Sequence, residues 1–168
     1  MSEIALSVVI PALDEGENLA LLLPQLGEVL QTLGAQAEII IVTERPDRVT
    51  IDAAARAGAR VVEQAERGYG GALLTGLASA RGSYVLTMDA DLSHPPTFIH
   101  ELWKHRHQGQ ITIASRYVEG GTAEMPRLRY VLSRVLNTLF KRGLSVGVRD
   151  LSSGFRLYGT AVMREQSY

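Results

Sequence analysis

Residues 6–42 of the chain read LSVVIPALDEGENLALLLPQLGEVLQTLGAQAEIIIV, and this stretch decides the fold. Its first run, Leu6–Pro11, is apolar and ends in proline, which is typical of a buried strand. Leucine and valine then recur with the period of a helix that we expect Asn18 to cap and Gly34 to end. Glu38–Val42 is a second apolar run. Two such strands joined by a helix predict a parallel pair within one sheet.

The alternation of strands and helices continues along the chain. We expect further strands at Ala59–Glu63, Ser83–Met88 and Gln110–Ser115, and further helices at Thr50–Ala57, Gly70–Ala80 and Pro95–His107. Pro24 falls inside the first helical pattern, where proline removes a hydrogen bond, so we expect it to kink or divide that helix. This order predicts an α/β fold in three layers, with a mainly parallel sheet between two layers of helices. Ligands of such sheets bind beyond the carboxyl ends of the strands, so functional loops are expected after Ile10, Val42, Met88 and Ser115.

Length and composition restrict the class of protein. A chain of 168 residues suits one domain, and the absence of cysteine excludes a disulfide framework. Its 17 basic and 18 acidic residues give a net charge of −1, which argues against a general nucleic-acid binder. No apolar run approaches the ~20 residues that span a bilayer, and Glu3 stands where a signal peptide would be basic. We therefore expect a soluble chain.

The basic residues are unevenly distributed. Residues 126–149 contain six basic residues and no acidic one, which leaves 11 bases against 18 acids in the remainder of the chain. We expect a domain with this uneven distribution of charge to bind an anionic ligand or an anionic lipid surface at its basic segment. A solvated basic helix face is the alternative interpretation of the same residues.

The segment from Met88 to Pro96 reads MDADLSHPP and follows an apolar strand. Asp89 and Asp91 are two residues apart, so on an extended segment both carboxylates point the same way. Two carboxylates at the carboxyl end of a strand suit Mg²⁺ or Mn²⁺, and such a cation can bridge the phosphates of a nucleotide-sugar. Acidic residues placed at a helix N-terminus are the alternative. His94 lies beside the pair and either contacts metal or phosphate or orients the turn at Pro95.

Five motifs in chain order carry a family resemblance. They are Val8-Val9-Ile10-Pro11 with Asp14-Glu15-Gly16-Glu17-Asn18; Arg67-Gly68-Tyr69-Gly70-Gly71-Ala72; Asp89 to Pro96; Ser115-Arg116-Tyr117 with Gly120-Gly121; and Ser133-Arg134 with Asn137, followed by Asp150-Leu151-Ser152-Ser153-Gly154-Phe155-Arg156. With these motifs the chain resembles the catalytic domain of a family 2 glycosyltransferase with the Rossmann-like GT-A fold. The fifth motif resembles the branch of dolichol-phosphate mannosyltransferases and polyprenyl-phosphate sugar transferases. The match runs over nearly all of the chain.

The resemblance implies that a mannose- or glucose-type hexose moves, with inversion, from a GDP- or UDP-sugar to a polyprenyl or dolichyl monophosphate. The enzyme would be cytoplasmic, and peripheral to or anchored at the cytoplasmic face of a membrane through parts outside this chain. By similarity, Asp89 and Asp91 would hold Mg²⁺ or Mn²⁺ and the donor diphosphate. The other donor-binding residues implied are Pro11, Leu13, Glu15, Glu44 and Ala90. The residues implied at the acceptor phosphate are Arg116, Arg129 and Ser133, and the two arginines would act in catalysis together with Asp89 and Asp91.

The helical pattern near residues 126–142 supports an acceptor site independently of the resemblance. Arg129 and Ser133 lie four residues apart and share one flank of an apolar arc, so both can meet the same ligand. A lipid phosphate arrives ionised and needs no general base, and the planar fork of arginine pairs phosphate oxygens in a bidentate manner. Arg127 and Lys141 lie on the opposite face, where we expect solvated side chains.

The chain also departs from the family pattern. Thr43 and Glu44 stand where relatives commonly have two aspartates, at the position of the base and ribose, so the choice between GDP- and UDP-sugars stays open. The sequence ends soon after the fifth motif, and we expect residues 1–168 to be a single catalytic domain that lacks C-terminal parts of a longer parent. Two other functions remain open. One is transfer to a sugar hydroxyl with Asp150 as the catalytic carboxylate; the other is nucleotide-sugar binding without turnover.

Overall fold

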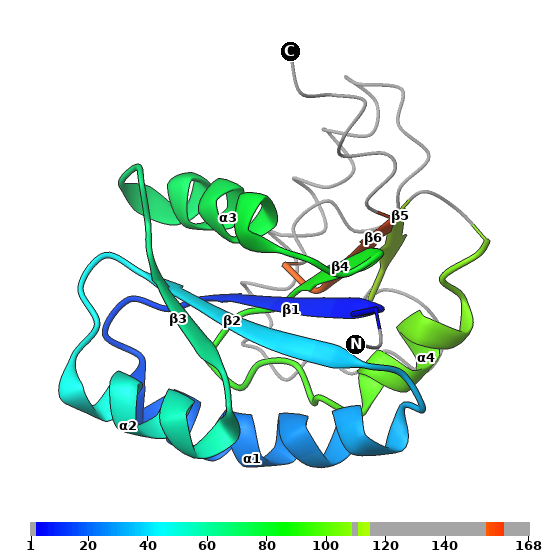
Figure 1. Cartoon of the computed structure of the whole chain (residues 1–168), viewed down its shortest axis with the longest axis horizontal. Coiled ribbons are helices and arrows are strands. Elements are labelled where there is room, and N and C mark those ends of the chain that lie inside the picture. Colours follow the sequence, from blue (N-terminus) through cyan, green and yellow to red (C-terminus); the bar gives the residue numbers. More distant parts are fainter. Residues whose placement is uncertain (1–2, 109–110, 115–153, 160–168) are drawn as a thin grey trace, which may run out of the picture.

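A computed structural model describes residues 3–108, 111–114 and 154–159 of the chain (Figure 1). Within these residues, helices and strands alternate from the N-terminus to the fifth strand. The strands are β1 (Leu6–Pro11), β2 (Ala37–Thr43), β3 (Arg60–Glu63), β4 (Tyr84–Thr87), β5 (Ile111–Ile113) and β6 (Arg156–Gly159). The helices are α1 (Gly16–Thr32), α2 (Arg48–Ala57), α3 (Gly68–Ser79) and α4 (Phe98–Lys104).

The strands form one sheet in the order β3-β2-β1-β4-β6-β5. β1 pairs in parallel with β2 and with β4, and β2 pairs in parallel with β3. β6 lies antiparallel between β4 and β5. The expected mainly parallel sheet is therefore confirmed, but the sequence analysis missed β6. This strand is only four residues long and has one buried side chain, Leu157, so it gives almost no apolar signal of its own.

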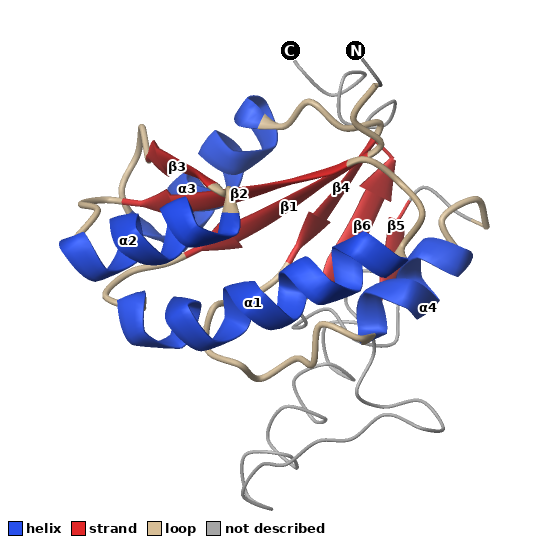
Figure 2. Cartoon of the chain, turned by 60° about the horizontal axis from the view of Figure 1, so that its bottom comes forward, coloured by secondary structure: helices blue, strands red, loops and turns tan. Residues whose placement is uncertain are grey.

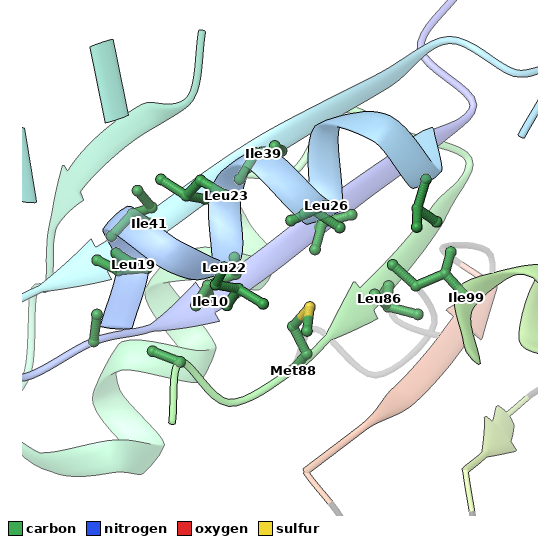
Figure 3. Packing of buried hydrophobic residues seen from close by; sticks show 14 of the residues in the cluster. Ile10, Leu19, Leu22, Leu23, Leu26, Ile39, Ile41, Leu86, Met88 and Ile99 are labelled. Carbon is green, nitrogen blue, oxygen red and sulfur yellow. The ribbon is translucent and has the colours of Figure 1, made fainter. Parts of the chain in front are cut away.

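Helices cover both faces of the sheet, which confirms the three-layer α/β/α architecture. α1, α2 and α4 lie on one face and α3 lies on the other (Figures 1 and 2). The larger cluster of buried residues joins alternate side chains of β1, such as Val8 and Ile10, to the leucines of α1 (Figure 3). The residue between them, Val9, belongs to a second cluster that includes Ala72 of α3. The period of two along β1 thus builds both cores.

The first helix differs from the prediction at Asn18 and at Pro24. α1 begins at Gly16, so Asn18 lies in the first turn, where its side chain donates to the Glu15 carboxylate instead of capping the helix. Pro24 does not divide the helix, which runs on to Thr32. Pro24 lies on the exposed face, where water can bond the carbonyl that loses its N–H partner, while the leucines on the other face stay buried.

The remaining expected elements are present with altered bounds: β3 and β4 are shorter than expected, whereas β2 and α2 are longer and α3 begins two residues earlier. The helix expected at Pro95–His107 is reduced to α4, because the chain before Phe98 forms turns. The strand expected at Gln110–Ser115 is β5, and its two outer residues lie outside the described residues. The helix expected near residues 126–142 also lies outside them.

Candidate active site

A cavity of about 320 Å³ opens at the carboxyl ends of the central strands. β1 ends at Pro11, β2 at Thr43 and β4 at Thr87, so the loops that follow these parallel strands meet at one edge of the sheet. α3 begins beside these loops at Gly68. The cavity is lined by Pro11, Ala12, Leu13, Glu15, Glu44, Gln64, Gly68, Tyr69, Ala72, Asp89, Ala90 and Asp91.

The structure brings together every residue predicted to surround the donor. Pro11, Leu13, Glu15, Glu44, Asp89, Ala90 and Asp91 all line this one cavity, although they come from three separate loops. Their contacts with a donor stay a prediction. The residues predicted at the acceptor phosphate, Arg116, Arg129 and Ser133, lie outside the described residues, as does Asp150.

The aspartate pair lies just beyond β4, and the chain bends from Ala90 onward. Ala90 is buried in the core, while Asp89 is half-buried and Asp91 is exposed, and both aspartates line the cavity. The backbone N–H of Ser93 donates to Asp91 Oδ1 at 3.0 Å and holds the turn. Leu92, between them, has a φ of 60°, a left-handed conformation that a leucine adopts only when its surroundings enforce it. The pair is therefore fixed by a tight turn, not by an extended strand as the sequence spacing suggests.

Tyr69 contacts the first aspartate from the start of α3. Its hydroxyl donates to Asp89 Oδ1 at 2.9 Å. Burial raises the pKa of the Tyr69 hydroxyl far above its ordinary value, and the negative charge of Asp89 and the hydrogen bond raise this pKa further. The tyrosine therefore remains a neutral donor throughout the physiological pH range. Tyr69 belongs to one of the five sequence motifs, but its contact with Asp89 could not be predicted because the two residues are 20 positions apart.

Glu44 and Gln64 form a second polar group on the cavity wall. Gln64 Nε2 donates to Glu44 Oε1 at 3.3 Å and to the backbone oxygen of Glu66 at 2.8 Å. The amide of Gln64 therefore steadies Glu44, which stands at one of the departures from the family pattern. Gln64 was not among the site residues predicted from the sequence. Its position directly after β3, at the same sheet edge as the other loops, is the signal that points to it.

His94 does not line the cavity. The residue is 9% exposed, its ring centroid lies 5.2 Å from that of Phe155, and its Nδ1 is 3.0 Å from Ser93 Oγ. These contacts favour the interpretation in which His94 orients the turn before Pro95.

The donor set of the cavity fits a divalent cation that is shared with a diphosphate. Within the described residues, no group of three or more histidine, aspartate or glutamate side chains is able to hold a metal ion alone. Asp89 and Asp91 instead offer two hard carboxylates at one opening. Mg²⁺ in proteins is usually held by one or two carboxylates together with substrate phosphates. The pair is therefore suited to a cation that binds jointly with a nucleotide.

The profile of the family "Glycosyl transferase family 2" matches residues 7–166 of the chain. The chain belongs to this family. This family agrees with the resemblance carried by the five motifs. The matched residues include all of the residues that line the cavity.

Three curated relatives share about a third of the aligned residues. An undecaprenyl-phosphate 4-deoxy-4-formamido-L-arabinose transferase of Edwardsiella ictaluri is 31% identical over 94% of this chain and 50% of its own length. A dolichol-phosphate mannosyltransferase of Pyrococcus furiosus is 36% identical over 76% of this chain and 38% of its own. The Saccharomyces cerevisiae dolichol-phosphate mannosyltransferase is 31% identical over 90% of this chain and 60% of its own. The chain thus spans from two fifths to three fifths of these family 2 proteins.

Solved structures confirm the GT-A fold. Mannosyl-3-phosphoglycerate synthase from Rubrobacter xylanophilus superposes with a TM-score of 0.73 at 19% identity, over 95% of this chain and 54% of that one. Glucosyl-3-phosphoglycerate synthase from Mycobacterium tuberculosis, crystallised with Mn²⁺, UDP and phosphoglyceric acid, gives a TM-score of 0.72 at 23% identity, over 95% of this chain and 57% of that one.

Within the described residues, no helix has both the length and the apolar character needed to cross a membrane.

Proposed function

We propose that this chain is the catalytic domain of an inverting glycosyltransferase. It transfers a hexose from a nucleotide-diphosphate sugar to the phosphate of a polyprenyl or dolichyl lipid. The observation that carries the proposal is the gathering of Asp89, Asp91, Glu15 and Glu44 at one cavity of a family 2 chain. The curated relatives add the acceptor class, because each is named for transfer to a lipid phosphate.

The cavity offers one environment for the nucleoside of a nucleotide-sugar and another for its diphosphate. Leu13 and the Glu44–Gln64 pair provide an apolar side chain and hydrogen-bonding groups for a nucleoside. Gly68 and Tyr69 belong to the first turn of α3, where the positive end of the helix dipole and the backbone N–H groups favour phosphate oxygens. Asp89 and Asp91 would hold Mg²⁺ or Mn²⁺ beside the diphosphate, and the cation would neutralise charge on the departing group.

The reaction itself places few demands on acid–base residues. An oxygen of the lipid phosphate attacks the anomeric carbon and forms the new C–O bond. The bond to the diphosphate breaks, its electron pair leaves with the nucleoside diphosphate, and the configuration inverts. Because the lipid phosphate is already ionised, no proton has to be removed from it. The main task is to gather two anions, for which Arg116, Arg129 and Ser133 are the predicted acceptor residues.

The acceptor class also suggests where the protein works. A polyprenyl phosphate lies in a bilayer, and nucleotide-sugars are made in the cytoplasm, so we place the active site at the cytoplasmic face of a membrane. The basic residues within 126–149 would face the anionic headgroups.

The direct test is a transfer assay with matched acceptors. The chain is incubated with Mn²⁺ and radiolabelled GDP-mannose, GDP-glucose, UDP-glucose or UDP-galactose. The acceptor is either a short polyprenyl phosphate or the corresponding polyprenol. We expect labelled lipid from at least one donor with the phosphate and none with the alcohol.

Two results would contradict the proposal. Transfer to the polyprenol, with none to the phosphate, would assign a hydroxyl acceptor. Tight nucleotide-sugar binding without product from any donor would assign a binding domain.

A further inference from the structure

Gly154 lies against the Asp89 carboxylate, although the two residues come from distant parts of the chain. A Cβ atom built on Gly154 would lie 2.7 Å from Asp89 Oδ2, 2.8 Å from Oδ1 and 3.0 Å from Cγ. Real Cβ atoms essentially never come closer than about 3.0 Å to such atoms. A side chain at this position would therefore press on both carboxylate oxygens and turn Asp89 away from its observed place.

The contact, and not the backbone, is what requires glycine here. The glycines with a positive φ in the described residues are Gly34, Gly58 and Gly68, so Gly154 has a conformation open to other residues. A side chain at position 154 would instead fill the space in front of Asp89. Gly154 therefore differs from the three glycines with a positive φ, where a substitution would strain the backbone itself.

Gly154 is held firmly where it meets Asp89. Thr87 Oγ1 donates to the Gly154 carbonyl oxygen at 2.7 Å, across 67 positions of sequence. The next residue, Phe155, is completely buried, and its carbonyl oxygen accepts from the backbone N–H of Ala114 at 3.0 Å. β6 then pairs with β4 from the Thr87–Arg156 match onward. The backbone of Gly154 is thus unable to move away from an added side chain at low cost.

Tyr69 makes a second contact with the same carboxylate. Its hydroxyl donates to Oδ1 at 2.9 Å, so one oxygen of Asp89 is tied to the start of α3. Three segments therefore converge on Asp89: the loop after β4 that carries it, the first turn of α3, and the segment that leads into β6. In metal sites, side chains that hydrogen-bond to a ligating carboxylate fix its orientation, and their loss typically weakens metal binding ~10–100-fold.

We propose that Tyr69 and Gly154 are positioning residues that fix the Asp89 carboxylate for a divalent cation and the donor diphosphate, Tyr69 by its hydrogen bond and Gly154 by its lack of a side chain. The inference rests on the proposed donor site and adds to it two residues that touch neither cation nor sugar in this role. It also gives the fifth sequence motif a function on the donor side, because the Gly154 backbone meets Asp89.

The test compares three single variants with the wild-type chain. Tyr69→Phe keeps the ring and removes the hydroxyl, and Gly154→Ala adds the methyl group in front of Asp89. Gly159→Ala is the matched control, because a Cβ there has nothing within 4 Å. GDP and UDP are titrated calorimetrically into each protein in Mn²⁺ and again in EDTA, and thermal melts are recorded without ligand.

We expect the affinity in Mn²⁺ to fall by about 10-fold in Tyr69→Phe and by up to about 100-fold in Gly154→Ala. The residual affinity in EDTA should match the wild type in both variants, since the nucleoside contacts are unchanged. Gly159→Ala should equal the wild type in both buffers. A merely structural role of these two residues would not produce a loss of nucleotide affinity in Mn²⁺ alone.

Wild-type affinity of both variants in Mn²⁺, or an equal loss in Mn²⁺ and EDTA, would overturn the inference. Tighter binding by Tyr69→Phe would overturn it too, because the hydroxyl would then compete with the cation. If Gly154→Ala fails to fold, Tyr69→Phe decides alone. If the wild type itself binds GDP and UDP equally in Mn²⁺ and EDTA, the metal-assisted donor site fails, and this inference fails with it.

Discussion

Glu38 is a largely buried carboxylate at the amino ends of the strands, opposite the edge that carries the cavity. It accepts hydrogen bonds from Ser7 Oγ at 2.7 Å and from the backbone N–H of Arg81 at 2.9 Å, and it pairs with Arg60 at 3.1 Å. Burial alone would raise the pKa of Glu38, but the two hydrogen bonds and the charge of Arg60 outweigh burial and hold this pKa below its ordinary value of 4.5.

The lowered pKa predicts how stability depends on pH. Because the folded-state pKa lies below the unfolded one, ionised Glu38 stabilises the fold fully above about pH 4.5, and this stabilisation is lost as the pH falls through the folded-state pKa. Glu38→Gln should lower the free energy of unfolding at pH 7 by about 1–3 kcal/mol, because it leaves charged and N–H donors poorly paired. Urea unfolding at pH 7 and about pH 3 measures the effect, and the difference from wild type should shrink in acid. Glu63→Gln, at an exposed site, is the control, and an undiminished difference in acid would refute the role of ionisation.

A substitution of Arg129 tests the prediction that donor and acceptor are bound by different residues. The residue lies outside the described part of the chain, so its role rests on the sequence alone. Arg129→Ala should slow transfer to a short polyprenyl phosphate by about 10²-fold or more, while donor affinity without acceptor stays unchanged. Arg127→Ala, on the other face of the helix predicted from the sequence, should matter little. An equal loss in donor affinity would move Arg129 to the donor site.

At the scale of elements, α3 packs unusually close to the sheet at Gly76. A Cβ there would lie 2.2 Å from Val9 Cγ1 and 3.1 Å from Val42 Cγ2. Gly76→Ala should therefore destabilise the fold by about 1–3 kcal/mol through overpacking. Gly27→Ala, within α1 and with nothing within 4 Å of its Cβ, should instead stabilise the fold by up to about 1 kcal/mol, because alanine favours helix. Thermal melts of the two variants should shift in opposite directions; equal shifts would contradict the close packing of α3.

The elements that the sequence predicts well are those whose signal is local. β1 agrees residue for residue, because a short apolar run that ends in proline is typical of a buried strand. Asn18 was a wrong helix cap because α1 begins two residues earlier, at Gly16. β6 was missed because its place is set by pairing with β4 and β5 rather than by its own residues. The same holds for the site: loops that follow strands were predictable, whereas the contacts of Tyr69 and Gly154 with Asp89 depend on how distant segments pack.

For the whole molecule, the residues predicted to bind the donor and those predicted to bind the acceptor fall on different parts of the chain. The described residues contain the cavity and all of its predicted donor-binding side chains. The residues predicted at the acceptor phosphate, Arg116, Arg129 and Ser133, lie outside the described part. The donor site can therefore be tested by binding alone, without lipid, and independently of the acceptor prediction.

The most direct test of the donor site is a calorimetric titration of GDP and UDP in Mn²⁺ and in EDTA. The wild type is compared with Asp91→Asn and with Asp52→Asn, a control whose carboxylate lies on α2 and pairs with Arg48 at the surface. Two carboxylates that face a diphosphate repel it unless a cation lies between them. We therefore expect one of the nucleotides to bind in Mn²⁺ to the wild type and Asp52→Asn, with binding largely lost in EDTA and in Asp91→Asn. Equal affinity in Mn²⁺ and EDTA, or wild-type binding by Asp91→Asn, would contradict a metal-assisted donor site at this cavity.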